Sequence, residues 1–314
     1  MPTTARTLFS GIIDYAGLFP PAKLPMDEAF RRFLAHRDSD DGWLLARFVC
    51  PAARLAELAP LIEDAGSAPA RIVALGGGGD DPPGFSASIE HDTEAMRGFG
   101  ERLGTAATID VFEVKLPGDG DPSEAVDLTF HHLDDTAEHP PAAFFETPLI
   151  GDTPDPDAVA NAIAAAGHRV DPDRVAGLKI RCGGLEAAAV PAVEPVAAVI
   201  AAARDAGLPV KATQGLHHPF RHLDGALGTT AHGFVNLVSA SIHSRHHRLD
   251  LDTIAAIIGE EDPDAFDVTD AGLVWRELVT PVDAVAEGRR TTFTGFGSCS
   301  FAEPRDDLAG LGWL

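Results

Sequence analysis

Lysine is scarce in this 314-residue sequence, which contains four lysines against 20 arginines. Arginine therefore serves wherever a generic surface cation is wanted. Lysine loses its proton readily on burial, whereas arginine keeps its charge, so the remaining lysines are candidates for chemistry rather than for surface charge alone. They are Lys23, Lys115, Lys179 and Lys211.

The sequence also has few cysteines, and we expect no apolar run that could cross a membrane. Cys50, Cys182 and Cys299 cannot all pair, and this count suits a reducing cytoplasm. None has a histidine and an acid beside it in the sequence, so we expect three small buried residues. The opening MPTTARTLFSG lacks the apolar run of a signal peptide, and no later stretch is expected to span a bilayer. The sequence predicts a soluble cytoplasmic protein with no membrane partner.

Acidic residues outnumber basic ones, because 48 acidic and 24 basic residues give a formal net charge of −24. Such a chain offers no basic surface to neutralise phosphates, which argues against nucleic acid as a partner. The glycine run GGGGDDPPG (76–84) lacks the lysine and the hydroxyl of a phosphate-binding P-loop. Any anion site must therefore carry its own local cations, and a small molecule is the expected partner.

Short apolar runs alternate with amphipathic stretches of helical period along the whole chain. This alternation is typical of parallel βαβ units. Eight such units in about 300 residues predict a closed (β/α)8 TIM barrel. The expected strands cover residues 10–17, 43–51, 71–77, 109–117, 143–151, 176–184, 208–215 and 291–301.

The seventh unit is longer than the others. Residues 232–248 and 251–261 have a helical pattern. Residues 266–277 predict a small hairpin with its turn at 270–272, and a further helix is expected near 281–288. We interpret residues from about 249 to 290 as a helix-plus-hairpin insertion before the last strand, within a single barrel domain that spans residues 1–314.

Charged residues occupy the inward positions of several expected strands. Alternate residues of a barrel strand face the interior and the surrounding helices, and the apolar positions fix the phase. In the fourth strand Phe112 and Val114 face outward, which places Glu113 inside. The predicted cluster lies at the C-terminal ends of the strands, where barrel active sites are built. Its members are Glu113, Lys115, Glu146, Lys179, Arg181, Lys211 and Thr213.

Two inward lysines on neighbouring strands indicate Schiff-base chemistry. Burial and the mutual repulsion of Lys179 and Lys211 are expected to depress a lysine pKa. A lysine of this kind can attack a carbonyl, and Glu113 or Glu146 could then move protons through water. This is class I aldolase chemistry, which needs no metal and no cofactor. The alternative is a buried ion-pair network that has no catalytic role.

Several strings resemble, in the same order, the deoxyribose-phosphate aldolase group of class I aldolase barrels. IIDYAGLFPPA is similar to the family's first strand, RFVCPAARL to its second and FFETPLIGDTPD to its fifth. GLKIRCGG resembles the sixth strand, which carries the Schiff-base lysine, and PVKATQGL the seventh. FGSCS resembles the eighth, which helps to hold phosphate. The strings KATxGLHHP and FGSCSF also resemble a set of uncharacterised bacterial proteins.

The resemblance implies roles for individual residues. Lys179 would be the nucleophile and Lys211 the residue that lowers its pKa, while Gly297 and Ser298 would lie near a substrate phosphate. The family's catalytic aspartate on the fourth strand could match Asp110. The alternation argument turns Asp110 outward, however, and favours Glu113.

The chain departs from the family where the substrate would bind. After the lysine of the sixth strand the family has small hydroxyl residues, whereas this chain has Ile180, Arg181 and Cys182. After the seventh strand the family has two adjacent glycines, whereas this chain has Gln214 and Gly215. These differences favour a carbonyl compound other than deoxyribose phosphate, such as one with a carboxylate that Arg181 binds.

Histidines follow the seventh strand in GLHHPFRH. His217 and His218 are candidates for substrate contact or acid–base catalysis near neutral pH. With Glu146 they could instead ligate a divalent metal, or they could be structural loop residues, and the sequence leaves these readings open. Asp14, near the end of the first strand, is a candidate for facing the pocket and pairing with a lysine.

Together these features predict a class I aldolase-like lyase that acts on a small oxo compound, with Lys179, Lys211 and Glu113 in the leading roles. One rival is a metal-dependent lyase, hydrolase or isomerase that uses the histidines and Glu146. A second rival is a non-enzymatic carboxylate-binding protein. Homo-oligomers are common among barrel enzymes, but nothing in the sequence marks an interface.

Overall fold

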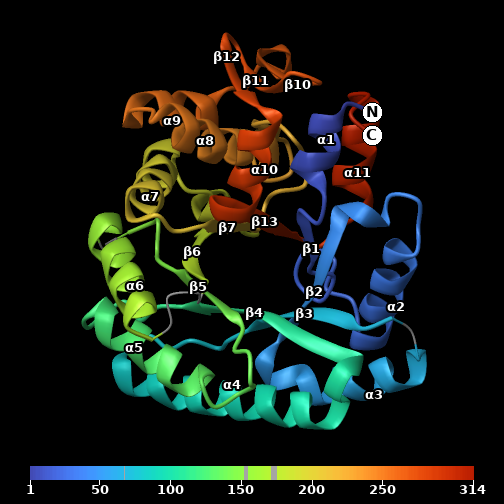
Figure 1. The fold of residues 1–314 in the computed structure, drawn as a ribbon, viewed down its shortest axis with the longest axis vertical. Helices are drawn as coiled ribbons and strands as arrows, with labels where there is room; N and C mark the ends of the chain where they lie inside the picture. Colours follow the sequence, from blue (N-terminus) through green and yellow to red (C-terminus); the bar gives the residue numbers. More distant parts are fainter. Residues whose placement is uncertain (67, 152–154, 171–174) are drawn as a thin grey trace.

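Eight parallel strands close into a barrel. The computed structural model describes residues 1–66, 68–151, 155–170 and 175–314, with the side chains of 167–170 left out. The strand order around the barrel is β1-β13-β7-β6-β5-β4-β3-β2, which confirms the predicted (β/α)8 TIM barrel and each expected strand (Figure 1). The barrel strands are β1 (Ile13–Tyr15), β2 (Leu45–Pro51), β3 (Ala70–Leu75), β4 (Ala107–Lys115), β5 (Ala142–Glu146), β6 (Ala176–Arg181), β7 (Val210–Thr213) and β13 (Phe293–Ser298).

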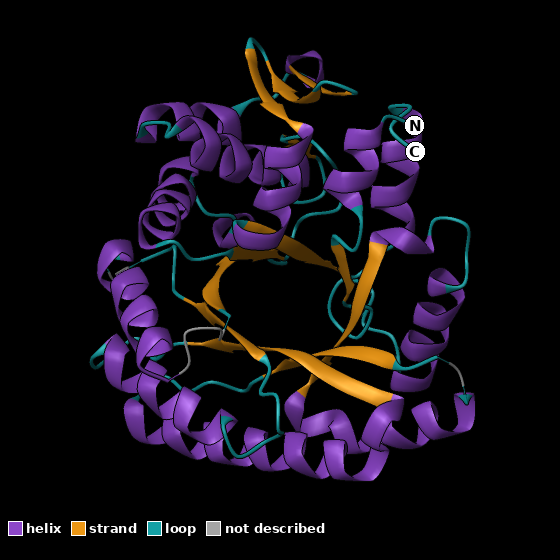
Figure 2. Cartoon of the chain, in the orientation of Figure 1, coloured by secondary structure: helices purple, strands orange, loops and turns teal. Residues whose placement is uncertain are grey.

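Helices surround the barrel as an outer ring (Figure 2). Side-chain caps mark where two of them begin, because Asp81 accepts a hydrogen bond from the amide of Gly84 and Asp121 from that of Ser123. Each of these caps is followed by proline, which suits the first turn of a helix. The helices that follow barrel strands are α2 (Met26–Arg37), α3 (Leu55–Ala65), α4 (Pro82–Leu103), α5 (Pro122–Leu133), α6 (Pro156–Val170), α7 (Val193–Ala206), α8 (Phe234–His247) and α11 (Ala302–Gly310).

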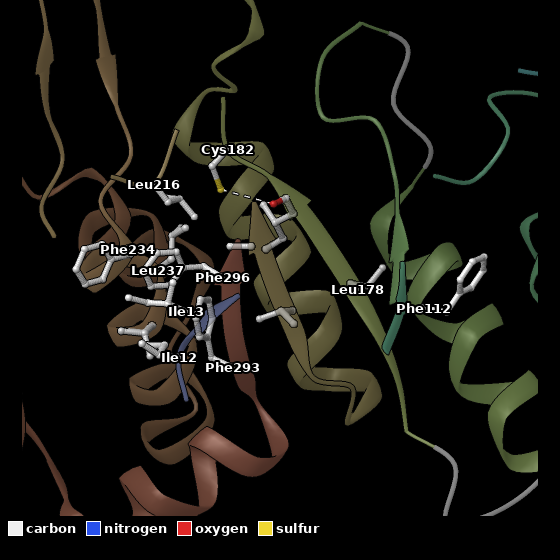
Figure 3. Close-up of a cluster of buried hydrophobic side chains, with 14 of the residues drawn as sticks. Ile12, Ile13, Phe112, Leu178, Cys182, Leu216, Phe234, Leu237, Phe293 and Phe296 are labelled. Atoms are coloured by element: carbon white, nitrogen blue, oxygen red, sulfur yellow. Dashed lines mark hydrogen bonds between the residues drawn. The ribbon is translucent and has the colours of Figure 1, made fainter. Parts of the chain in front are cut away.

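The apolar core has two parts. A large cluster fills the space between the strands and the helices, and Figure 3 shows part of it around Phe234, Phe293 and Phe296. A second, much smaller cluster lies on the inward face of the strands and consists of Val49, Val73, Val111 and Phe144. The barrel interior therefore has little apolar filling, which leaves its inward positions to charged side chains.

Several elements lie outside the eight βα units. The predicted helix, hairpin and helix before the last strand are present, but the hairpin gains a third antiparallel strand that the sequence did not indicate. A short N-terminal helix and a two-stranded sheet after β7 were also not expected. These elements are α1 (Thr3–Phe9), β8 (His222–Asp224), β9 (Thr229–Ala231), α9 (Leu251–Gly259), β10 (Phe266–Thr269), β11 (Gly272–Trp275), β12 (Leu278–Pro281) and α10 (Val282–Thr291). Short 3-10 turns occur at Gly42–Leu44, Ala52–Arg54, Gly104–Ala106, Ala187–Ala189 and Pro263–Ala265.

One stretch, Ala187–Ala206, is long and apolar enough to cross a membrane by length and composition, which corrects the expectation from the sequence. Most of this stretch is α7, which packs against α6, α8, α9 and β6. Its residues Val196, Val199 and Ile200 are buried in the core between the helices and the barrel. Packing against the barrel is a sufficient reason for its apolar character.

Candidate active site

Lys179 lies inside the barrel between two carboxylates. Its Nζ is 2.9 Å from Oε2 of Glu113 and 3.1 Å from Oε2 of Glu146. The strand register explains this arrangement, because Lys179 on β6 is the partner of Glu146 on β5. All three side chains are less than a tenth exposed. The predicted inward phase of Glu113 and Lys179 is thus confirmed, and Glu146, on a strand whose apolar residues allow either phase, also faces inward.

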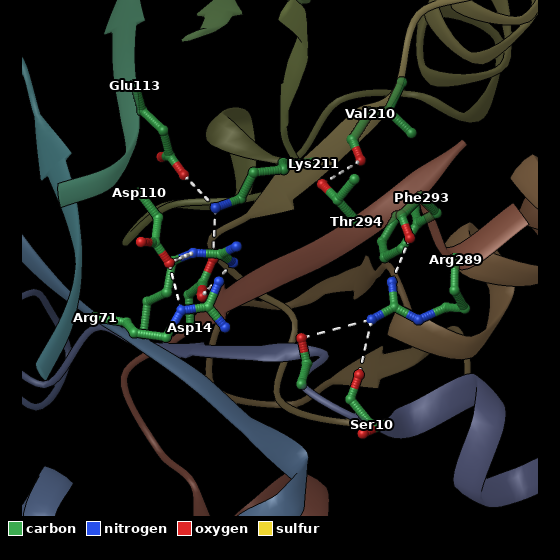
Figure 4. Close-up of polar contacts among 12 residues, drawn as sticks. Ser10, Asp14, Arg71, Asp110, Glu113, Val210, Lys211, Arg289, Phe293 and Thr294 are labelled. Atoms are coloured by element: carbon green, nitrogen blue, oxygen red, sulfur yellow. Dashed lines mark hydrogen bonds and ion pairs between the residues drawn. The ribbon is translucent and has the colours of Figure 1, made fainter. Parts of the chain in front are cut away.

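Lys211 shares one of these carboxylates. Its Nζ is 2.7 Å from Oε1 of Glu113 and 2.5 Å from Oδ2 of Asp14, and its side chain is 3% exposed (Figure 4). Lys211 is the register partner of Lys179 on the neighbouring strand, so Glu113 lies between the two ammonium groups and bridges them. The expected pairing of Asp14 with a lysine is confirmed.

Ion pairs extend this arrangement in both directions. Toward the C-terminal end of β6, Arg181 Nε donates to Oε1 of Glu146 at 2.6 Å. On the other side, Arg47 Nη1 lies 3.4 Å from Oδ1 of Asp14. Anions and cations therefore alternate through the barrel in one connected series, which we call the ion chain. Its members in order are Arg181, Glu146, Lys179, Glu113, Lys211, Asp14, Arg47, Asp110 and Arg71.

The expectation that Asp110 faces outward is wrong. The register of β4 against β3 shifts between Ile109 and Val111, and this irregularity adds a residue to the strand at Asp110. Its carboxylate therefore lies 3.2 Å from Nε of Arg47 and 2.5 Å from Nε of Arg71. Figure 4 shows Asp110 and Glu113 extending from β4 toward the same group of cations.

The carboxylates determine the protonation of Lys179. Burial alone would lower the pKa of Lys179, but the nearby charges of Glu113 and Glu146 raise it above its ordinary value. Burial likewise opposes ionisation of Glu113, yet Lys179 and Lys211 lower the pKa of that carboxyl to about 2. The pKa of Glu146 is lowered by Lys179 and Arg181 against its burial. The expectation of a depressed pKa at Lys179 is therefore wrong, because Glu113 separates the lysines.

Lys115 does not join the cluster, contrary to the prediction. It is the last residue of β4, its side chain is 47% exposed, and its Nζ lies 3.7 Å from Oδ1 of Asp80. The alternation holds along β4 from Val111 onward, but a long side chain on the last strand residue is free to turn to solvent. Arg181 is similar in being 45% exposed, yet it turns back over Glu146 and also donates to Oε1 of Gln214 at 3.1 Å.

Thr213, Gly297 and Ser298 lie together at the C-terminal end of the barrel. Gly297 on β13 is the register partner of Thr213 on β7. A Cβ at Gly297 would approach Oγ1 of Thr213 to 3.1 Å, so a larger residue would crowd this position. Ser298 is buried and is the register partner of Tyr15 on β1.

The two adjacent histidines contact the C-terminal helix. His217 Nδ1 is 2.8 Å from Oε2 of Glu303, and His218 Nδ1 is 2.7 Å from Oδ2 of Asp307. Both carboxylates belong to α11. Within the described residues, no three His, Cys, Asp or Glu side chains group together in a way that could hold a metal ion. The proposed metal ligands His217, His218 and Glu146 are accordingly not gathered into one such group.

Cys50 and Cys182 are buried as expected, whereas Cys299 is only partly buried. Its Sγ lies 3.8 Å from Nε2 of His217. The expectation that Cys299 is a buried residue without a histidine and an acid around it is therefore wrong, because the fold brings His217 to Cys299 and Glu303 contacts the other side of the same ring. Neighbours in sequence could not reveal this group.

The strand order and the ion chain define the class: a (β/α)8 barrel with a charged interior. No protein-family model and no curated protein matches the sequence. The chain is similar to the tetrameric deoxyribose-phosphate aldolase of Aeropyrum pernix, with a TM-score of 0.43 and 15% identity over 68% of this chain and 80% of that one.

Two further solved structures are similar at the same level. One is a candidate deoxyribose-phosphate aldolase from Toxoplasma gondii ME49, with a TM-score of 0.41 and 11% identity over 98% and 96% of the two chains. The other is the lysine/ornithine decarboxylase of Vibrio vulnificus complexed with cadaverine, with a TM-score of 0.41 and 13% identity over 94% and 58%. Likeness this distant carries no argument about activity, and the fold assignment rests on the strand order.

Proposed function

We propose that this barrel is a Schiff-base-forming carbon–carbon lyase that acts on a small oxo compound. The observation that supports the proposal is the buried Lys179, held between Glu113 and Glu146 toward the C-terminal end of the barrel strands. The chemistry requires no metal and no organic cofactor. All three cysteines are free thiols, which supports the reducing, cytoplasmic location expected from the sequence.

The carboxylates act in two stages of this mechanism. When a carbonyl compound enters, Lys179 passes a proton to Glu113 or Glu146, and the free amine attacks the carbonyl carbon. Loss of water then gives an iminium ion, whose positive charge lies where the ammonium charge was. The same two carboxylates stabilise that cation, so the arrangement that protonates the resting lysine also favours the covalent intermediate.

Cleavage needs a base and later an acid. Glu113 removes the proton from the β-hydroxyl group, the carbon–carbon bond breaks, and the electron pair passes into the iminium to leave an enamine. Return of the proton to the enamine carbon and hydrolysis release the second product and free Lys179. Lys211 keeps Glu113 ionised between turnovers.

Arg181 is the proposed anchor for an anionic substituent of the substrate. Its side chain is 45% exposed, with Nε engaged by Glu146 and Nη1 by Gln214, so Nη2 can reach a carboxylate in the entrance and Gln214 can give way to it. Arginine binds carboxylate through two parallel hydrogen bonds. Lys115, which pairs with Asp80 at the surface, stays outside the proposed machinery.

Borohydride trapping tests the proposal without a known substrate. The protein is incubated with a panel of small aldehydes, ketones and oxo acids, reduced, and mapped by peptide mass spectrometry. We expect a reduced adduct on Lys179 with at least one compound, and no adduct there in Lys179→Arg, which keeps the charge of the ion chain. Lys23 is exposed and serves as the reference for non-specific reduction. Adducts on Lys23 but never on Lys179 would refute the assignment.

A carboxylate-binding protein without catalysis is the second candidate. The raised pKa of Lys179 favours it, because a lysine that stays protonated is a binding group rather than a nucleophile. Under this alternative, oxo acids would raise the melting temperature of the protein, and the effect would depend on Arg181, but reduction would leave no adduct on Lys179.

A further inference from the structure

Cys299, His217 and Glu303 form a connected group at the C-terminal end of the barrel. Cys299 follows directly after β13, His217 lies on the loop after β7, and Glu303 is in the first turn of α11. Cys299 Sγ lies 3.8 Å from Nε2 of His217, while Nδ1 of the same ring lies 2.8 Å from Oε2 of Glu303. One ring nitrogen therefore faces the thiol and the other faces the carboxylate.

This is the order of contacts that activates a nucleophile. A base must lie beside the nucleophile, and a third group must hold the base in the correct orientation and tautomer. Glu303 fixes Nδ1 as the protonated nitrogen, which leaves Nε2 to take the proton of Cys299. The position of Glu303 is itself supported, because its backbone amide donates to Oγ of Ser300 at 3.2 Å.

Accessibility distinguishes Cys299 from the other two cysteines. Cys50 and Cys182 are 0% and 1% exposed, and burial raises the pKa of Cys50 to about 12 and that of Cys182 still further. Cys299 is only partly buried. The side chains of His217 and Glu303 are 22% and 51% exposed, so the group can be reached from solvent.

We propose that Cys299, His217 and Glu303 are a second reactive centre, independent of Lys179, that accepts an acyl group from an activated ester or thioester. Cys299 is the nucleophile, His217 the general base and acid, and Glu303 the positioning residue. α11 begins three residues after Cys299, and its positive dipole end favours negative charge on the sulfur and on the attacked carbonyl oxygen.

The electrostatics support the direction of proton transfer. The hydrogen bond to Cys299 and the one to Glu303 raise the pKa of His217 to about 9 against the effect of its burial. Glu303 stays ionised, because the hydrogen bond from His217 lowers its pKa despite partial burial. The imidazole of His217 consequently has a high affinity for the proton that it takes from Cys299.

The acyl-transfer steps balance without a further reactant apart from water. The sulfur forms a bond to the carbonyl carbon, the bond from that carbon to the leaving oxygen or sulfur breaks, and His217 returns its proton to the leaving group. Water then attacks the acyl-cysteine with His217 as the base, which releases a carboxylic acid and restores the thiol.

The first test measures alkylation by iodoacetamide at pH 7 in the whole protein, followed by peptide mass spectrometry. An unassisted thiol is only a few per cent thiolate at this pH, so a thiol beside a base gains reactivity. A stabilised thiolate is also a weaker nucleophile, which offsets part of that gain. We therefore expect Cys299 to react about tenfold faster than glutathione. Cys50 and Cys182 are the internal controls and should stay unlabelled. His217→Gln should lower the rate to that of glutathione or below.

The matched control is His218→Gln, which removes the adjacent histidine that also pairs with a carboxylate of α11. It should leave the labelling rate of Cys299 unchanged. Equal rates in the two histidine variants, or a wild-type rate no faster than that of glutathione, would overturn the proposal. Glu303→Gln should give an intermediate rate, which a purely structural role of Glu303 would not produce.

The second test uses p-nitrophenyl acetate as the acyl donor. We expect a burst of p-nitrophenolate stoichiometric with the protein, an acetyl group on the Cys299 peptide, and loss of both in Cys299→Ser. Absence of acetylated Cys299 would overturn the acyl-transfer proposal. Neither test involves an oxo compound or borohydride, so failure here is distinct from failure of the Schiff-base proposal.

Discussion

Replacing Glu113 with glutamine removes the charge that joins the two buried lysines while keeping the size of the side chain. Lys179 then retains only Glu146, and Lys211 retains only Asp14. Removing one member of a buried ion pair costs about 3–5 kcal/mol, because it leaves charge without compensation. The pKa of Glu113 gives a similar figure, since its lowering to about 2 corresponds to about 3 kcal/mol of stability at neutral pH.

The destabilisation of Glu113→Gln should depend on pH. A carboxyl whose folded-state pKa is depressed contributes stability above its ordinary pKa and loses that contribution as the pH falls toward the folded-state value. The difference in free energy of unfolding between wild type and variant should therefore be largest at pH 7. At pH 3 it should shrink to roughly half, because the unfolded chain is by then protonated at this position. Urea unfolding at the two pH values measures both quantities.

The control for this experiment is Glu57→Gln. Glu57 pairs with Arg54 at the surface, where both side chains are more than a third exposed, so its replacement should change stability little at either pH. If Glu113→Gln were as stable as the Glu57 variant, or if its destabilisation did not shrink in acid, Glu113 would not bridge two buried cations in the folded protein.

Three further predictions concern the site and the barrel. Adduct formation at Lys179 should accelerate as the pH rises through the alkaline range, because Glu113 and Glu146 raise the pKa of Lys179 and only the free amine reacts. A trapping rate that does not change with pH would contradict this. Arg181→Gln should raise the half-saturating concentration of a trapped oxo acid about tenfold, the effect of losing a hydrogen bond to a charged group, and leave that of an uncharged aldehyde unchanged. Gly177→Ala should lower the melting temperature strongly, since its Cβ would lie 2.3 Å from the carbonyl oxygen of Pro209. Gly98 is exposed within α4, so the control Gly98→Ala should stabilise the protein by about 0.5–1 kcal/mol.

The barrel was predictable because its determinants are local. Each strand is a short apolar run bounded by loop residues, and alternation along such runs correctly turned Glu113, Lys179 and Lys211 inward. The third strand of the insertion, β12, has four residues, and β8 and β9 have three each. The pattern therefore identified the barrel strands and the hairpin strands β10 and β11, and missed these three short strands.

The ion chain beyond the pairing of Lys211 with Asp14, from Arg47 to Arg71, was not predictable from the sequence. Arg47 lies in LARFVCP, where a single charge in an apolar run gives no indication of its partner. The inward turn of Asp110 depends on a strand irregularity that alternation cannot reveal. The depressed pKa expected at Lys179 was wrong for a related reason, since the sequence showed two lysines on adjacent strands but not the carboxylate between them.

The group around Cys299 illustrates the same limit. His217 is 82 positions away from Cys299 in the sequence, and the pairing of β7 with β13, the last two barrel strands, brings them together. Glu303 lies only four residues after Cys299, in the first turn of α11, and contacts His217. Strand pairing thus supplies the base that the local sequence lacks.

Glu113 and Glu146 hold Lys179 as a buried ammonium ion in the resting protein, and the titration of that ion can be followed directly. Lysine labelled with 13C at Cε should give four NMR signals, assigned by Lys→Arg variants and followed across the alkaline range. We expect Lys179 to lose its proton at a higher pH than an ordinary exposed lysine. A Lys179 that loses its proton at a lower pH than an ordinary lysine would show that the two carboxylates do not control its charge.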